Sequence, residues 1–237
     1  MTATTLLRRL AMSAVTVLAM AALLTDPSAA QQAQPTIKKA DPGKPATAQK
    51  TPVKPAPQAV QTPTQVIEAF NASLLKAMKE GATLGFDGRV KLLDPSVRKT
   101  YDLQNVARRA AGPHWEKFTA AQQKQYVEAF TRLSATTYAG RFKSFDGEEF
   151  KLLGAEDTSR GDTVVKTEII TSKKEHVAIN YLMRKTDSGW RVIDVFVKGT
   201  ISEVATKRSD FGAVLNQSGF DGLMAAIEKK IADAKAG

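Results

Sequence analysis

The most regular alternation of side chains lies between Ser188 and Ser202. In a strand, alternate residues face opposite sides of the sheet. The two predicted faces are Trp190, Val192, Asp194 and Phe196 on one side, and Arg191, Ile193, Val195 and Val197 on the other. Because both faces are mostly apolar, this strand is expected to lie inside a sheet with a layer of side chains or ligand on each side. Asp194, a carboxylate within an apolar run, then needs a partner or a wet cavity.

Shorter alternating runs precede this strand at residues 150–153, 163–171 and 177–183. The polar links between them are short, which favours hairpins and an antiparallel meander. A turn at Asp187-Ser188-Gly189 leads into the strand described above.

Apolar residues at three- and four-residue spacing predict helices before and after the strands. The first begins at Pro63, after Thr62, and stops at Gly81 and Gly85. Further helices are predicted at 102–111, at about 120–142 after a capping box from Thr119 to Gln122, and near 209–217 and 221–234. Residues 86–100 predict a short helical or irregular run with a break at Asp94-Pro95.

This order of helices, consecutive strands and helices predicts an α+β domain. The helices are expected to pack on one side of a curved, mainly antiparallel sheet of four to five strands. The apolar residues exceed what helices covering one sheet face need, so an apolar cavity can form between the two layers.

The first 63 residues predict an exported chain with a linker. Arg8-Arg9, the apolar run 10–24 and Ser28-Ala29-Ala30 have the order of a signal peptide, residues 1–30, cleaved near Ala30. The run is shorter than the roughly 20 residues that a membrane-spanning helix needs. Residues 31–63 contain seven of the ten prolines and five lysines, which predicts a disordered linker. Residues 64–237 form the predicted folded domain.

Charge argues against nucleic acid as a partner. The net charge is +10, of which residues 1–30 carry +1 (two Arg, one Asp) and residues 31–63 carry +4 (five Lys, one Asp). The remaining +5 is spread over residues 64–237 without a basic stripe. Transient contact with an anionic membrane surface suits such a mild excess.

No reaction can be assigned from the residues. The chain has no cysteine, and its two histidines, His114 and His176, have no metal-ligand spacing. A glycine-rich phosphate loop and a Gly-x-Ser-x-Gly elbow are both missing from the sequence. We therefore expect a protein that is not an enzyme and has no cofactor.

Several short motifs resemble one family in their order and spacing. They are Tyr101-Asp102-Leu103, Gly112-Pro113-His114-Trp115, Thr119 with Gln122-Gln123 and Phe130, Leu133 through Thr137-Tyr138-Ala139, Gly189 through Val195, Lys198 through Ser202, Arg208 through Phe211, Gly219, Leu223 and Lys229-Lys230. Residues 64–231 resemble the periplasmic phospholipid-binding proteins of the Mla (MlaC, toluene-tolerance) family, especially its hopanoid-associated HpnM branch. The family pattern has an acidic residue and Gly-Val-Ser where this chain has Lys198-Gly199-Thr200-Ile201-Ser202. This departure and the HpnM likeness both point away from an ordinary glycerophospholipid ligand.

The resemblance implies a periplasmic carrier that holds a phospholipid or hopanoid between sheet and helices and moves it between inner and outer membranes. An inner-membrane lipid transport complex is its implied partner. Candidate cavity residues are Phe70, Leu74, Tyr126, Phe130, Tyr138, Ile169, Tyr181, Met183, Trp190 and Phe196. Arg141 and Arg208 are candidates for contact with the head group at the mouth.

Two other functions remain open at this stage. The expected fold is a sheet-and-helix cone of the nuclear-transport-factor-2/cystatin type. In its nuclear-transport-factor-2-like form it could be an enzyme acting on a small apolar substrate, with Asp194 and His114 beside an apolar pocket. A protein-binding module of the cell envelope is the other alternative, and it predicts a filled interior.

Overall fold

The computed structural model describes residues 61–236. The predicted signal peptide and nearly all of the predicted linker lie outside the described residues, so both stay predictions. The helices are α1 (Pro63–Lys79), α2 (Gly81–Thr100), α3 (Leu103–Ala111), the 3-10 helix η3 (Gly112–Lys117), α4 (Ala120–Arg141) and α5 (Glu203–Ala236). The strands are β1 (Glu149–Asp157), β2 (Thr163–Ile170), β3 (His176–Thr186), β4 (Gly189–Val197) and β5 (Ile201–Ser202).

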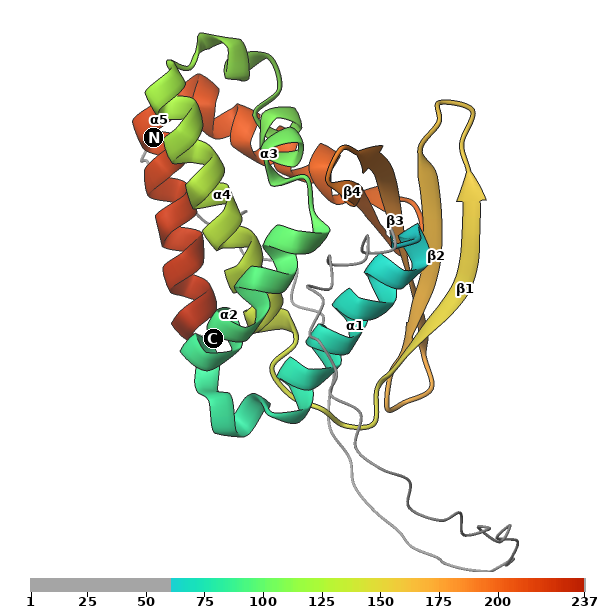
Figure 1. Cartoon of the computed structure of the whole chain (residues 1–237). Coiled ribbons are helices and arrows are strands. Elements are labelled where there is room, and N and C mark those ends of the chain that lie inside the picture. Colours follow the sequence, from blue (N-terminus) through green and yellow to red (C-terminus); the bar gives the residue numbers. More distant parts are fainter. Residues whose placement is uncertain (1–60, 237) are drawn as a thin grey trace, which may run out of the picture. The chain divides into compact units, whose positions relative to one another are not determined.

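The α+β prediction is confirmed. Figure 1 shows α4 and α5 side by side on one side of the domain, with the sheet on the other side and α1 against it. Among residues 61–236, no helix is long and apolar enough to span a bilayer.

Local hydrogen bonds fix the starts of α1 and α4 as predicted. The Thr62 hydroxyl accepts from the backbone N–H of Gln65 at 3.2 Å, and the Gln65 side chain accepts from the Thr62 N–H at 2.9 Å. Thr119 and Gln122 repeat this reciprocal pair at the start of α4. Each capping box satisfies two backbone N–H groups that the first helical turn leaves unpaired.

The predicted break at Asp94-Pro95 is wrong. The α2 helix continues through Pro95 and is instead kinked at Gly85, where φ is +61°. Pro95 is exposed, whereas Leu93 and Val97 are fully buried, so packing of the buried stripe keeps the helix together. The last helix was also predicted to begin too late, because α5 starts at Glu203 and is kinked at Gly219.

The sheet is the predicted meander, with order β1-β2-β3-β4-β5 and antiparallel neighbours throughout. The strand around Trp190 is β4, which lies between β3 and the two-residue β5. The chain before α3 also touches this strand, since Tyr101 forms a parallel bridge with Val192.

A bulge in β4 corrects the predicted faces of that strand. Leu182 pairs with Asp194, but the next residue of β3, Met183, pairs with Val192, so Ile193 is an extra residue. An inserted residue reverses the alternation beyond it. Val192 and Val195 therefore both belong to the core on the helix side, whereas Phe196 pairs with Asn180 and is half-buried.

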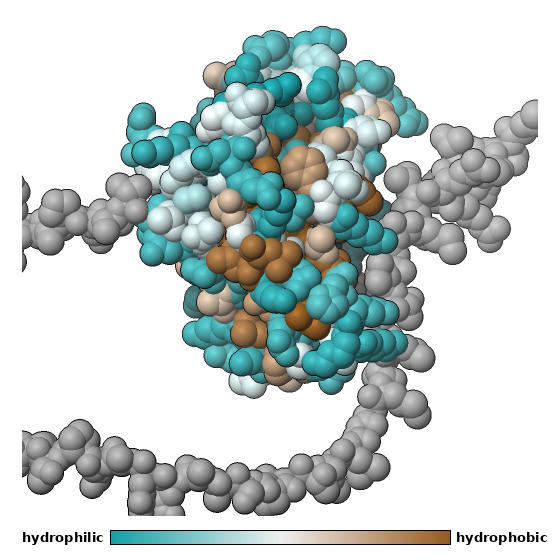
Figure 2. Space-filling view, turned by 90° about the vertical axis from the view of Figure 1, so that its right-hand side faces the viewer, coloured by the Kyte–Doolittle hydropathy of each residue, from teal (hydrophilic) through white to brown (hydrophobic). Residues whose placement is uncertain are grey.

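The outer face of the sheet keeps some apolar side chains. Alternation along β2 and β3 places Val164, Ile170 and Leu182 opposite the buried positions, and all three are half-buried. Figure 2 shows the side of the domain on which the sheet lies in Figure 1, with hydrophobic side chains in the middle of a mostly hydrophilic surface.

Buried apolar residues form two cores. The bundle core comprises Val106, Ala107, Ala110, Ala111, Trp115, Phe118, Tyr126, Ala129, Phe130, Leu133, Val204, Phe211, Leu215, Leu223 and Ile227. The sheet core comprises Val66, Ile67, Phe70, Leu74, Ala77, Leu93, Val97, Tyr101, Ala139, Val165, Tyr181, Met183, Val192 and Val195. Leu103 packs against both cores, and the cavity described below lies where they meet.

Candidate functional site: an apolar cavity between the sheet and the helices

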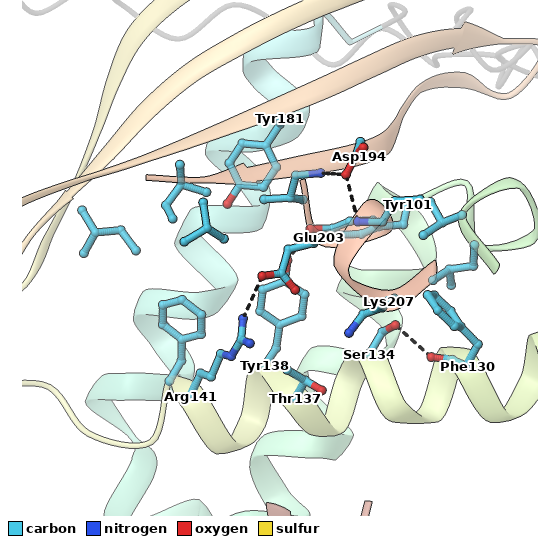
Figure 3. A pocket seen from close by; sticks show the side chains of 18 residues that line it. Tyr101, Phe130, Ser134, Thr137, Tyr138, Arg141, Tyr181, Asp194, Glu203 and Lys207 are labelled. Atoms are coloured by element: carbon cyan, nitrogen blue, oxygen red, sulfur yellow. Dashed lines mark hydrogen bonds and ion pairs between the residues drawn. The ribbon is translucent and has the colours of Figure 1, made fainter. Parts of the chain in front are cut away.

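A cavity of about 260 Å³ lies between β2–β4 and the helices α3, α4 and α5. Its wall is mostly apolar, with a few polar groups (Figure 3). The lining residues are Tyr101, Leu103, Val106, Phe130, Ser134, Thr137, Tyr138, Arg141, Phe142, Ile169, Ile179, Tyr181, Asp194, Val195, Val197, Glu203, Val204 and Lys207. The expectation of a filled interior, which the envelope-module alternative carried, does not hold here.

The helix α4 supplies one wall at helical spacing. Phe130, Ser134, Thr137, Tyr138 and Arg141 follow one another at intervals of one, three or four residues and all line the cavity. The hydroxyls of Ser134 and Thr137 donate to carbonyls four residues earlier, at 2.8 and 2.7 Å. Because these bonds satisfy the two hydroxyls within the helix, the polar positions of this wall do not require a polar ligand.

Three tyrosines face the cavity from different elements. The hydroxyls of Tyr101 and Tyr138 are hydrogen-bonded to each other. Phe70 packs behind the three, with edge-on contacts to the rings of Tyr101, Tyr138 and Tyr181 at centroid distances of 5.6, 5.1 and 6.4 Å. Burial raises the pKa of Tyr138 to about 12 and raises the pKa values of Tyr101 and Tyr181 as well. All three are therefore neutral at physiological pH and present uncharged polar tips.

The cavity reaches the surface at a group of charged residues. Arg141 lines the cavity although its side chain is 59% exposed, and its guanidinium lies 3.9 Å from the Glu203 carboxylate. Lys207, one turn beyond Glu203 on α5, is half-buried and also lines the cavity. Desolvation lowers the pKa of Lys207, with the Glu203 carboxylate opposing that effect.

The Asp194 carboxylate is hydrogen-bonded by several groups, and its role is structural. One carboxylate oxygen accepts from the backbone N–H of Val195 at 2.8 Å and of Val204 at 3.2 Å. The other accepts from the Ser202 hydroxyl at 2.7 Å and lies 3.7 Å from the Arg109 guanidinium. The carboxylate thus ties β4 to the first turn of α5, where a negative charge is favourable.

The pairing of Asp194 with His114 that the enzyme alternative required is not built into this cavity. His114 lies in η3, is half-buried and is not among the lining residues. The other histidine, His176, contacts Glu168 at 3.0 Å on β2. Within residues 61–236, no group of three His, Cys, Asp or Glu side chains could hold a metal ion.

Five of the twelve predicted site residues lie at the cavity, namely Phe130, Tyr138, Ile169, Tyr181 and Arg141. The other seven lie elsewhere. Phe70, Leu74 and Met183 are fully buried in the sheet core, and Tyr126 is fully buried in the bundle core. Trp190 lines a more polar surface hollow with Arg191.

The last two predicted residues that lie away from the cavity are Phe196 and Arg208. The β4 bulge places Val195 and Val197, not Phe196, in the cavity wall. Arg208 is exposed and lies over Gly112, where an added Cβ would come within 2.9 Å of its Nε. Its neighbour Lys207 is the basic residue of α5 that lines the cavity.

Sequence reasoning missed several other lining residues. Spacing could have identified Ser134, which lies four residues after Phe130 and four before Tyr138 on the predicted helix. Glu203 and Lys207 could not be found in this way, because the predicted last helix began only after them.

The fold and cavity define a class of α+β protein in which a half-covered antiparallel sheet and a helical layer enclose one apolar chamber. The family model described as "MlaC protein" matches residues 68–229, more than half of the chain, so the chain belongs to the MlaC family.

A solved structure has a similar fold. It is the structure of a phospholipid-binding protein from Ralstonia solanacearum in complex with a phospholipid, at 22% sequence identity and a TM-score of 0.63. The match covers 71% of this chain and 96% of that chain.

Proposed function

We propose that this protein is a periplasmic lipid-binding carrier that moves a phospholipid or hopanoid between the inner and outer membranes. The observation that carries the proposal is the apolar cavity of about 260 Å³ between sheet and helices, with an opening beside Arg141. Membership of the MlaC family and the phospholipid bound to the Ralstonia protein support the same reading.

A carrier is needed because exposing lipid chains to water is unfavourable. Burial of one methylene is worth ~0.8 kcal/mol, so two 16-carbon chains lose about 25 kcal/mol on exposure to water. A protein that replaces the membrane interior by an apolar chamber removes this cost and must then release the lipid at its destination. A chamber with neutral tyrosine tips and few fixed polar partners suits both steps.

The volume of the cavity limits how much of a lipid it can hold. Ligand pockets span roughly 300–1,000 Å³, so 260 Å³ is small for a lipid site. We therefore expect the cavity to widen when both chains of a diacyl lipid enter it.

The proposal also covers the location of the protein, its partner and the class of its ligand. The signal-like residues 1–30 support a periplasmic location, and the family likeness supports docking to an inner-membrane lipid transport complex. For the ligand, the HpnM-like features of the sequence favour a hopanoid, whereas the Ralstonia structure favours a phospholipid.

Lipid extraction tests the proposal. The protein should be purified from its native envelope without detergent and its extract analysed by mass spectrometry. A stoichiometric hopanoid or phospholipid supports carriage and selects the ligand class. A lipid-free protein that also fails to take lipid from vesicles would contradict it.

A further inference from the structure

Three charged side chains converge at the mouth of the cavity. Arg141 extends from α4, whereas Glu203 and Lys207 are separated by one turn of α5. Figure 3 shows Arg141 pointing toward Glu203 and the Lys207 amine pointing into the space beside Tyr138 and Ser134. Two cations and one carboxylate leave this group with a net charge of +1.

Lys207 is the unusual member of the group. It is half-buried, and the described part of the chain offers it neither a hydrogen bond nor an ion pair. The charges that act on it are the attractive Glu203 and Asp210 and the repulsive Arg141 and Lys230. Removing an ammonium from water without a close partner is unfavourable, so a counter-anion at this point would be strongly favoured.

Glu203 does not fill that role. Its carboxylate lies 3.9 Å from Arg141, near the limit of an ion pair, and forms no ion pair with Lys207 among the described contacts. Nor is the start of α5 free to bind an anion. Ser202 accepts from the Ala205 N–H at 2.9 Å, and Asp194 accepts from the Val204 N–H. An anion at the mouth would therefore bind the side chains of Lys207 and Arg141.

We propose that Lys207 and Arg141 bind the single anionic group of an apolar-tailed ligand, a phosphodiester or a carboxylate, and that Glu203 competes with it for the same cations. The inference rests on the proposed function and narrows its ligand class, because it makes the cavity selective for anionic amphiphiles, such as a phospholipid, over neutral ones, such as an uncharged hopanoid. The tail occupies the apolar chamber while the anionic group stays at the mouth.

Ligands that share the same tail and differ in the head group show how much the head group contributes to binding. We suggest 1-decanoyl-lysophosphatidylglycerol as the phosphodiester, decanoate as the carboxylate and monodecanoylglycerol as the neutral reference. All three are used below their critical micelle concentrations, with binding measured by isothermal titration calorimetry. Single ten-carbon tails suit a cavity of about 260 Å³ and avoid the attraction of a basic protein to charged vesicles.

Three variants and one control test the residues. Lys207→Met and Arg141→Met keep most of the side-chain volume and remove the charge, and Glu203→Gln removes the competitor. Lys229→Met is the matched control, since Lys229 is on the same helix, is 73% exposed and pairs with Asp233. Circular dichroism checks that each variant is folded.

The wild type should bind an anionic ligand at least tenfold more tightly than monodecanoylglycerol, which corresponds to ~1.4 kcal/mol. Lys207→Met should remove most of this preference, Arg141→Met part of it, and Lys229→Met none, while Glu203→Gln should increase it. A loss confined to the lysophospholipid identifies a phosphodiester site, and an equal loss for decanoate identifies a site for either anion.

The inference is overturned if wild type and all three variants bind the ligands with the same preference. Should Lys207→Met fail to fold, the other two variants test the inference. Arg141→Met should lower the preference for the anionic ligand and Glu203→Gln should raise it. Failure of the wild type to bind any of the three ligands, together with lipid-free protein from the envelope, would instead contradict the proposed function itself.

Discussion

The tyrosine hydroxyls of the bundle core and of the sheet side differ in their hydrogen bonding. Tyr126 is fully buried in the bundle core, with ring contacts to Trp115, Phe118, Phe130 and Phe211. Its hydroxyl has no hydrogen-bond partner among residues 61–236. On the sheet side, Tyr101 and Tyr138 bond to each other at the cavity. The Tyr126 hydroxyl is therefore enclosed by rings of the bundle core, whereas the hydroxyls of Tyr101 and Tyr138 border the open space where the two cores meet.

This difference separates stability from binding. Loss of a ring from the filled bundle creates a new void, and voids in close-packed cores are destabilising. Loss of a ring that already faces an open space creates less new void. We therefore expect substitutions in the bundle core to change mainly the free energy of unfolding, and substitutions at the cavity to change mainly ligand binding.

The largest expected effect comes from a pair of phenylalanines. Phe211→Ala removes a buried ring of the bundle core that contacts Tyr126 and Phe130, and should lower the free energy of unfolding by ~3–5 kcal/mol. Phe142→Ala, at the half-buried cavity wall, should cost clearly less. Urea denaturation followed by circular dichroism measures both, and equal losses would contradict the comparison.

Two glycines outside both cores, one in close contact and one in open space, give the next largest effect. An added Cβ at Gly81 would lie 2.1 Å from the Lys143 carbonyl oxygen, where α2 meets the segment after α4. Gly81→Ala should therefore destabilise by ~1–3 kcal/mol. Gly212→Ala, in α5 with open space around its Cα, should be neutral or stabilise by up to ~1 kcal/mol. Thermal unfolding of the two variants should give shifts of opposite sign or a shift at Gly81 alone.

The smallest effects should differ in sign between the tyrosines. Tyr126→Phe removes a buried hydroxyl that no group of the described domain bonds, so stability should stay the same or rise slightly. Tyr101→Phe breaks the hydrogen bond to Tyr138 and should cost ~1 kcal/mol. Chemical denaturation of both variants against wild type checks this, and a loss of stability at Tyr126 as large as that at Tyr101 would contradict the comparison.

Local signals made much of the fold predictable. The capping boxes at Thr62 and Thr119 involve residues three positions apart, so the sequence contains both partners of each hydrogen bond. Asp102 likewise caps α3 through the Asn105 N–H at 3.1 Å. The meander followed from short polar links, because such links leave few ways to join consecutive strands.

The cavity wall was harder to predict because distant contacts decide it. The bulge at Ile193 depends on pairing with β3 and moves Phe196 out of the wall. The helix α4 is buried on more than one side, so its periodicity could not separate Tyr126, which faces the bundle, from Tyr138, which faces the cavity. The role of Asp194 required Ser202 and the start of α5 to be placed beside it.

The central claim is that the cavity is where the lipid binds, and filling the cavity tests it most directly. Ser134→Phe projects a ring from α4 into the chamber, and Ser209→Phe, at an exposed position of α5, adds the same ring outside it. Native mass spectrometry of the three proteins, purified in parallel from the envelope, reports the bound lipid mass. We expect lipid on the wild type and on Ser209→Phe but not on a folded Ser134→Phe. Equal lipid on all three proteins would contradict the account.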